Sequence, residues 1–177
     1  ILIVRCKIGV SEANLRLSKI LRCFPYIAFP DSRVLILGSM PSLRSLQQNQ
    51  YYAHPQNRFW RVMFALAEEE YSADYEIKKQ VLKKLKVALW DSIGLCEREG
   101  SMDADIKNET PNDIRGLLKS YPSIEKIAAN GGKSAATLKK FFPEIKFTAL
   151  PSTSPANAAF SLSRLISVYG EFVKREP

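Results

Sequence analysis

Four short apolar runs, separated by stretches with helical periodicity, constrain most strongly what this chain can fold into. They lie at Arg33–Leu37, Val87–Trp90, Ile124–Ala129 and Ile145–Leu150. Such short runs are typical of strands buried on both faces of a sheet. Apolar residues at helical spacing occupy positions 60–67, 77–85, 133–142 and 160–173. Strands that alternate with helices predict an α/β fold, a three-layer sandwich with a mainly parallel four-stranded sheet flanked by helices.

Two further helices are expected outside this alternation. The first begins at Ser11, which can cap it, and its apolar residues recur at helical spacing as far as Phe24. The second begins with Thr110 as the N-cap and Pro111 in the first helical position, where a missing backbone donor does no harm. Lysines at positions 78, 79, 83, 84 and 86 are expected to form a solvated helix face.

The charge of the chain favours a polyanionic partner. With 26 Lys and Arg against 18 Asp and Glu, the net charge is +8 and the isoelectric point is near 9.4. Nucleic acid comes first among such partners. Solubility alone would also account for this excess, so the charge needs support from motifs.

Cysteine and histidine are too few and too scattered for a metal site. Cys6, Cys23 and Cys96 form no CxxC pair, and His54 is the only histidine, which excludes zinc centres built on two or three histidines. A chain of 177 residues can bury enough surface to fold as one domain without disulfides. We therefore expect no metal and no cofactor.

No segment of the sequence predicts a membrane span. The apolar runs are far shorter than the roughly 20 residues that cross a bilayer, and Arg5 interrupts the first run before it could form a signal core. We expect no membrane contact, a cytoplasmic location and a monomer.

Polar and small residues follow each predicted strand. Because the carboxyl ends of parallel strands meet at one edge of a sheet, these segments are expected to converge on one ligand crevice. They are Gly38–Ser42, Asp91–Gly94, Asn130–Ser134 and Ser152–Asn157, joined by the aromatic segment Tyr51–Trp60. Each alone is better explained as a turn or a helix cap, and residues 131–134 lack the first glycine of a P-loop. Their convergence favours a functional site.

Three of these segments carry a family resemblance. GSMPS at 38–42, YYAHPQNRFW at 51–60 and LPSTSPANA at 150–158 resemble motifs of the uracil-DNA glycosylase superfamily, specifically its hypoxanthine-DNA glycosylase (DNA-deoxyinosine glycosylase) branch. The resemblance covers Phe24 to Val173, so residues 1–23 are interpreted as an N-terminal extension and residues 24–177 as one glycosylase-like domain. It implies a base excision repair enzyme that flips a deaminated base, hypoxanthine above all, out of double-stranded DNA. The enzyme would hydrolyse the N-glycosidic bond and leave an abasic site.

The resemblance also implies roles for residues of the site. Uracil-removing branches carry an Asp or Asn at the position of Met40 and a His at the position of Leu150. Both positions are apolar here, and the resemblance to the hypoxanthine branch, which relies on an asparagine of the first motif, implies the catalytic role for Asn57. The implied base pocket consists of Ser39, Met40, Tyr52, His54 and Asp91, in which Tyr52 would stack on the flipped base. By hydrogen-bond logic, an Asp91 carboxylate would accept from N1–H of hypoxanthine and repel the bare N1 of adenine.

Contacts with the DNA backbone are assigned to the remaining polar segments. They would be made by Ser42, Gly131, Gly132, Lys133, Ser134, Ser152, Thr153, Ser154, Pro155 and Asn157.

Other readings stay open at this point. They are a uracil or mismatch-type glycosylase of the same superfamily, a non-catalytic DNA-damage-binding domain of the same fold, and a flavodoxin-like enzyme acting on a small molecule. Against the last, Met40 and Pro41 make the loop after the first strand a poor phosphate cradle.

Overall fold

The computed structural model describes residues 20–174 and is organised around a parallel sheet. Its strands are β2 (Val34–Gly38), β3 (Val87–Asp91), β6 (Lys126–Asn130) and β7 (Thr148–Leu150). They are ordered β3-β2-β6-β7 and every neighbouring pair is parallel. The predicted four-stranded sheet is therefore confirmed, although its last strand is shorter than the apolar run suggested.

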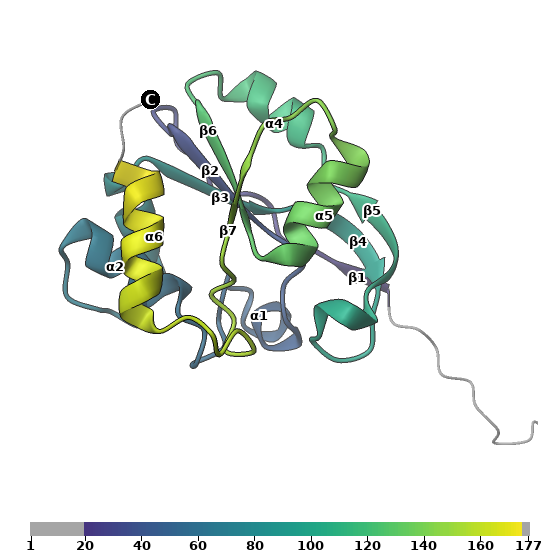
Figure 1. The fold of residues 1–177 in the computed structure, drawn as a ribbon, viewed down its shortest axis with the longest axis horizontal. Helices are drawn as coiled ribbons and strands as arrows, with labels where there is room; N and C mark the ends of the chain where they lie inside the picture. The colour runs from purple at the N-terminus through teal and green to yellow at the C-terminus, as the bar shows by residue number, and fades with distance from the viewer. Residues whose placement is uncertain (1–19, 175–177) are drawn as a thin grey trace, which may run out of the picture.

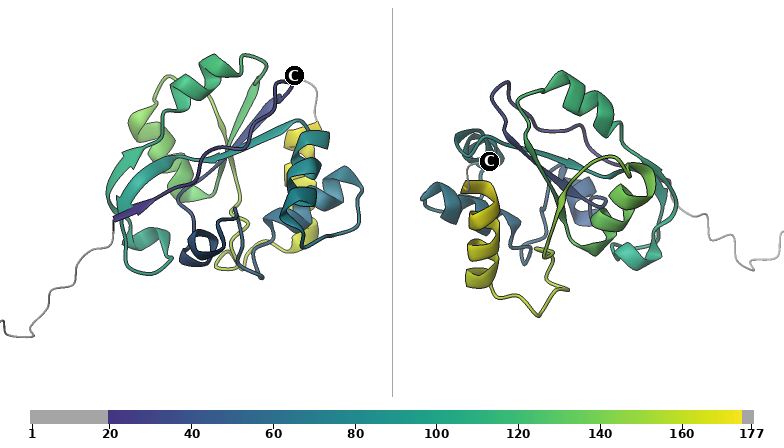
Figure 2. Two further views of the ribbon diagram at one scale, coloured as in Figure 1. Left: turned by 180° about the vertical axis from the view of Figure 1, so that it is seen from behind. Right: turned by 45° about the horizontal axis from the view of Figure 1, so that its top comes forward.

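Helices cover both faces of this sheet, as predicted (Figures 1 and 2). On one face lie α2 (Phe59–Ala67), α3 (Tyr75–Lys84) and α6 (Leu162–Lys174), and on the other α4 (Ile114–Ser120) and α5 (Gly132–Phe141).

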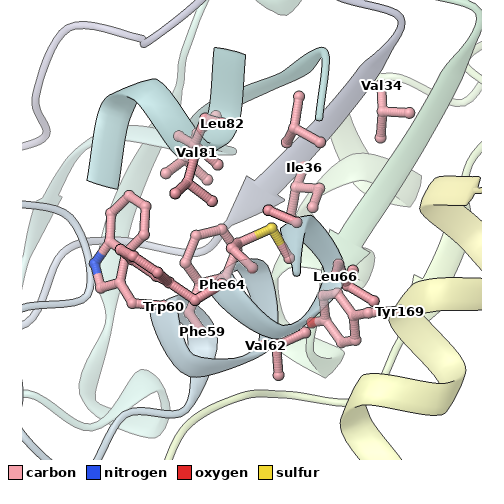
Figure 3. Close-up of a cluster of buried hydrophobic side chains, with 14 of the residues drawn as sticks. Val34, Ile36, Phe59, Trp60, Val62, Phe64, Leu66, Val81, Leu82 and Tyr169 are labelled. Carbon is pink, nitrogen blue, oxygen red and sulfur yellow. The ribbon is translucent and has the colours of Figure 1, made fainter. Parts of the chain in front are cut away.

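Alternate residues of β2 enter different cores. Val34 and Ile36 pack against the α2, α3 and α6 side (Figure 3), and Leu35 and Leu37 pack against the α4 and α5 side. This alternation follows from the period of two in a strand and explains why an uninterrupted apolar run was needed.

A second, antiparallel sheet was not predicted. It consists of β1 (Ile20–Arg22), β4 (Ile93–Glu97) and β5 (Lys107–Pro111), in the order β1-β4-β5. The expected helix from Ser11 to Phe24 is thus wrong over its last part, and residues 11–19 lie outside the described residues. Leu21 is buried between exposed neighbours and is paired with Cys96. A segment of three residues such as Ile20–Arg22 fits a helical and a strand period equally well, so its pairing with β4 determines that it is a strand.

The helix expected at Thr110 begins later. Thr110 and Pro111 belong to β5, an edge strand in which a proline is tolerated. The N-cap of α4 is Asp113, whose carboxylate accepts a 2.9 Å hydrogen bond from the backbone N of Gly116. The N-cap of this helix therefore lies three residues further along the chain than predicted.

The face of α3 also differs from the prediction. Lys78 is only 6% exposed, and its ammonium lies 5.7 Å from the ring centroid of Trp60 and 6.0 Å from that of Tyr71. Ile77, expected in the core, is 46% exposed. The expected solvated lysine face is therefore wrong at Lys78, because its ammonium group lies beside two aromatic rings.

Within residues 20–174, no helix is both long and apolar enough to cross a bilayer.

Candidate active site

A pocket of about 510 Å³ opens at the carboxyl end of the parallel sheet. Its walls are made by residues 38–42, 44–45, 51–52, 54, 57, 101–103 and 152–157, together with Asp91 and Asn130 at the ends of β3 and β6. Figure 1 shows α1 (Leu43–Gln48) and the loop after β7 meeting at this end of the sheet. The structure brings together the predicted catalytic and base-pocket residues: Ser39, Met40, Tyr52, His54, Asn57 and Asp91 all line this pocket.

Asp91 is the most deeply placed carboxyl group of the pocket. Its side chain is 3% exposed, and its Oδ2 atom has no hydrogen-bond partner among the described residues. Burial and the charge of Asp103 raise the pKa of Asp91 while Arg98 lowers it, and together they bring it to about 8. At neutral pH the group is therefore mostly protonated. The role of Asp91 in reading the base stays a prediction, and the raised pKa favours a neutral carboxyl group, which both donates and accepts, over the expected carboxylate.

Tyr52 is held by contacts on two sides. Its ring stacks on Phe59 with centroids 4.1 Å apart and planes 22° apart, and its hydroxyl oxygen accepts a 3.0 Å hydrogen bond from Nδ2 of Asn130. Its backbone is left-handed, with φ of 52°. Burial raises the pKa of the Tyr52 hydroxyl well above its usual value. Tyr52 is therefore a fixed, neutral wall of the pocket.

Asn130 was not singled out from the sequence. Its Oδ1 atom accepts from the backbone N of Thr153 at 3.1 Å, and its Nδ2 donates to Thr153 Oγ1 at 3.1 Å as well as to Tyr52. One buried amide thus ties the loop after β7 to the aromatic wall. An asparagine at a strand exit was the available signal, but only the fold shows which residues it joins.

The side-chain oxygen of Asn57 is engaged in a hydrogen bond, whereas its side-chain nitrogen is not hydrogen-bonded to any described residue. Its Oδ1 atom accepts a 2.9 Å hydrogen bond from the backbone N of Phe59, at the start of α2. Its own backbone N donates to the carbonyl oxygen of His54 at 2.8 Å. No described residue accepts from its Nδ2, and the residue lines the pocket. Asn57 therefore stabilises the helix start and retains a free N–H₂ group.

Arg58 organises the opposite wall, a role that sequence reasoning missed. Its guanidinium donates to the carbonyl oxygens of Thr153 at 3.3 Å, Ser154 at 2.5 Å and Asn157 at 2.9 Å, and also to that of Phe160. The planar fork of arginine suits several acceptors at once. The shape of the loop after β7 thus depends on this side chain.

The remaining predicted DNA contacts fall into two groups. Ser42 and the loop residues Ser152, Thr153, Ser154, Pro155 and Asn157 line the pocket, whereas Gly131, Gly132, Lys133 and Ser134 do not. Ser134 is fully buried and its hydroxyl donates to the carbonyl oxygen of Leu37 at 2.7 Å, so the expected phosphate contact by this hydroxyl is wrong. Lys133 is paired with Glu109.

Packing accounts for the apolar residues at positions 40 and 150. Met40 is buried in a small core beside Ile93 and Cys96, and Leu150 is buried in the core under α2 and α6. Leu150 therefore belongs to the interior, and Met40, which also lines the pocket, contributes an apolar wall to it. Among residues 20–174 no cluster of three or more His, Cys, Asp or Glu side chains could hold a metal ion.

Comparisons with known proteins agree with this architecture. The family model of the uracil DNA glycosylase superfamily matches residues 24–169. A protein named hypoxanthine DNA glycosylase from Methanosarcina acetivorans is 39% identical over 147 residues, which cover 81% of this chain and 92% of the relative. One of the same name from Methanosarcina barkeri is 37% identical over 112 residues, covering 63% of this chain and 71% of the relative.

A solved structure is similar as well. The solution NMR structure of a candidate uracil DNA glycosylase from Methanosarcina acetivorans superposes with a TM-score of 0.73 at 34% identity, covering 89% of this chain and 100% of the other. The matched residues include every strand of the parallel sheet and the walls of the pocket. The chain therefore belongs to the uracil DNA glycosylase superfamily.

Proposed function

We propose that this protein is a monofunctional DNA glycosylase of base excision repair that removes hypoxanthine from double-stranded DNA. It hydrolyses the bond between the deaminated base and its deoxyribose and leaves an abasic site. Membership of the superfamily and 39% identity to a hypoxanthine DNA glycosylase support the proposal. That identity carries the choice of base, and the buried carboxyl group of Asp91 supplies a group in the pocket that can bind the base edge.

A neutral carboxyl group complements the edge of hypoxanthine. This base presents O6 as an acceptor beside N1–H as a donor, so the acid can donate to O6 and accept from N1–H. Adenine offers the reverse pattern, which a neutral acid also satisfies. Selection against adenine therefore rests on extrusion, since a mispaired base loses less pairing energy when it leaves the helix.

Tyr52 is assigned the role of stacking on the face of the flipped base. The stacked ring of Phe59 supports Tyr52 from behind, and the Asn130 hydrogen bond fixes its tilt. Stacking of a base on an aromatic side chain contributes about 1–3 kcal/mol. A ring that is already immobilised loses little further freedom when the base arrives.

Asn57 is assigned the polar catalytic role. Because its Oδ1 atom is occupied by the backbone of Phe59, the N–H₂ group is the part left for chemistry. A preorganised donor can hold the attacking water or stabilise negative charge on the departing base. His54 lies next to it along the pocket wall and accepts from the backbone N of Gln56 through Nδ1.

Contacts with the DNA backbone are assigned to the pocket mouth and to the start of α5. Ser42, Ser152, Ser154, Pro155 and Asn157 line the pocket, and the backbone N–H of Gly132 with the side chain of Lys133 lies at the helix start. Such groups bind phosphates and fix register without reading sequence. The expected phosphate contacts by Gly131 and Thr153 are wrong, because the backbone N of Gly131 donates to the carbonyl oxygen of Leu150 and Thr153 is fully buried.

Incubation with four otherwise identical duplexes tests the function. They carry hypoxanthine, uracil, xanthine or normal adenine at one position, and alkaline cleavage reports each abasic site. Cleavage of the hypoxanthine duplex, well ahead of the other three, is expected. Preferred cleavage at uracil would instead identify a uracil-type enzyme, and tight binding of the hypoxanthine duplex without cleavage would identify a damage-binding domain.

A further inference from the structure

A second carboxyl group lies in the same pocket, and no role has been assigned to it. Asp103 begins the short 3-10 helix η1 (Asp103–Asp105), in the connection between β4 and β5. It lines the pocket, and the hydroxyl of Ser39 donates a 2.7 Å hydrogen bond to its Oδ1 atom. This bond joins Asp103 to the loop that follows β2. Sequence reasoning had no way to find Asp103, because that connection shows no motif.

The two carboxyl groups differ in depth. Asp91 is only 3% exposed, whereas Asp103 is an exposed residue. A flipped nucleotide enters a pocket base first, because its sugar stays tied to the DNA backbone. The deep group therefore meets the base, and the group near the mouth meets the sugar and solvent.

Hydrolysis of the glycosidic bond needs a group on the sugar side. Positive charge develops on the deoxyribose as the bond to the base breaks, and a water molecule must lose a proton as it attacks. Met40 is apolar and packed in a core, and the only oxygen of the Asn57 side chain already accepts from the backbone of Phe59. A carboxylate at the mouth can do what neither of these residues does.

The surroundings of Asp103 suit that task. Desolvation raises its pKa, while the Ser39 hydrogen bond and the charges of Arg98 and Lys133 lower it, and the balance leaves the pKa raised from its ordinary value. The charge of Asp103 in turn raises the pKa of Asp91. Asp91 is buried deep in the pocket and Asp103 is held by Ser39 at a more exposed position, so the two carboxyl groups suit different partners, one the base and one the water.

We infer that Asp103 is a catalytic residue of the glycosylase, the carboxylate that orients and deprotonates the water attacking C1′, with Ser39 as its positioning residue. The inference rests on the proposed function. The water oxygen forms the new bond to C1′, and the bond from C1′ to N9 breaks with its electron pair passing to the base. One proton of the water passes to Asp103, and the departing base takes a proton from solvent.

Single-turnover excision from the hypoxanthine duplex tests this assignment. Asp103→Asn keeps the acceptor for Ser39 but removes the base, so the rate should fall on the order of 10²-fold while the dissociation constant for the duplex stays within about threefold. The matched control is Asp105→Asn, which removes the same charge from the same turn outside the pocket and should leave the rate unchanged.

A second variant separates chemistry from folding. Asp103→Ala should be as slow as Asp103→Asn, and added formate should restore part of its rate because a small carboxylate can replace the missing one. Ser39→Ala should reduce the rate about tenfold, in keeping with the loss of one hydrogen bond of about 1–1.5 kcal/mol, and formate should not restore it.

The outcomes distinguish this inference from the proposed function. An active wild type with Asp103→Asn within threefold of it, or with Asp105→Asn equally slow, would overturn the role of Asp103 alone. Absence of rescue by formate in a folded Asp103→Ala would also count against it. A wild type that excises no base from any duplex would overturn the proposed function together with the inference.

Discussion

The Oδ1 atom of Asp91 lies 2.4 Å from the position that a Cβ atom would take on Gly38. The two residues pair in register at the carboxyl ends of β3 and β2, and the same Cβ position is 3.0 Å from the hydroxyl oxygen of Tyr52. Only glycine at position 38 leaves room for both side chains. The floor of the pocket is therefore shaped by a missing side chain as much as by those present.

Gly38→Ala should consequently displace Asp91. We expect a loss of about 1–3 kcal/mol in the free energy of unfolding, as for overpacked interiors, and a loss on the order of 10²-fold in excision rate from misplacement of the acid. Urea unfolding and single-turnover excision measure the two effects. Gly170→Ala, in the middle of α6, is the matched control and should keep full activity. Normal excision by Gly38→Ala would show that the position of Asp91 is unimportant.

Asn57 has two roles that substitutions can separate. Asn57→Asp and Asn57→Ser keep an oxygen for the backbone N of Phe59, whereas Asn57→Ala removes it and should cost about 0.5–2 kcal/mol of stability. All three lack the amide N–H₂ group, so each should lose on the order of 10²–10³ in single-turnover rate. Retained excision in Asp and Ser variants of normal stability would reduce Asn57 to a helix cap.

The buried carboxyl group of Asp91 makes stability depend on pH. Its pKa is about 8 in the folded protein against 3.8 for an ordinary aspartate, so the folded state keeps a proton that the unfolded state releases. The free energy of unfolding should therefore fall as pH rises between these two values, by about 1.4 kcal/mol per pH unit at most, and level off above them. Asp91→Asn removes this contribution.

Urea unfolding of both proteins at pH 5, 6, 7 and 8 (chosen to span that window) measures the difference. The wild type should lose stability relative to Asp91→Asn as pH rises. A constant difference between the two proteins would mean that Asp91 is ionised in the fold, and the neutral-acid account of base recognition would be wrong.

Tyr52 offers a test of base stacking. Tyr52→Phe keeps the ring on Phe59 but loses the hydrogen bond from Asn130, so stability should fall by about 1 kcal/mol with little change in DNA affinity. Tyr52→Leu loses the flat face, and its affinity for the hypoxanthine duplex should drop by about 1–3 kcal/mol. Binding titrations with hypoxanthine-containing and undamaged duplexes measure this effect. Equal affinity of the Leu and Phe variants for the hypoxanthine duplex would exclude stacking.

Arg58 should be irreplaceable by lysine. Lysine keeps the charge but lacks the planar fork that serves the carbonyl oxygens of the loop after β7. We expect Arg58→Lys to lose about 2–3 kcal/mol of stability and to bind the duplex more weakly. Arg61→Lys, on an exposed position of the same helix, is the control. If both variants behave alike, the loop is held by other contacts.

The local pattern of the chain was sufficient for the parallel sheet and most helices. Runs such as that at Val34–Gly38 must be apolar on both faces, and a pattern of that kind has few other structural solutions. It failed where a segment was too short for its period to be read, as at Ile20–Arg22. It also failed at Lys78, where aromatic neighbours from elsewhere in the chain determine burial.

For the site, the sequence by itself determined which segments meet, because the exits of parallel strands share one edge and the motifs lie at those exits. Only the tertiary structure decided how the side chains of the site are protonated and which groups they contact. It raised the pKa of Asp91 through burial, brought Asp103 to Ser39, which lies 64 positions earlier in the sequence, and set Arg58 against a loop about 100 residues away. Protonation and long-range hydrogen bonds depend on depth and on neighbours distant in sequence, and no local pattern encodes either.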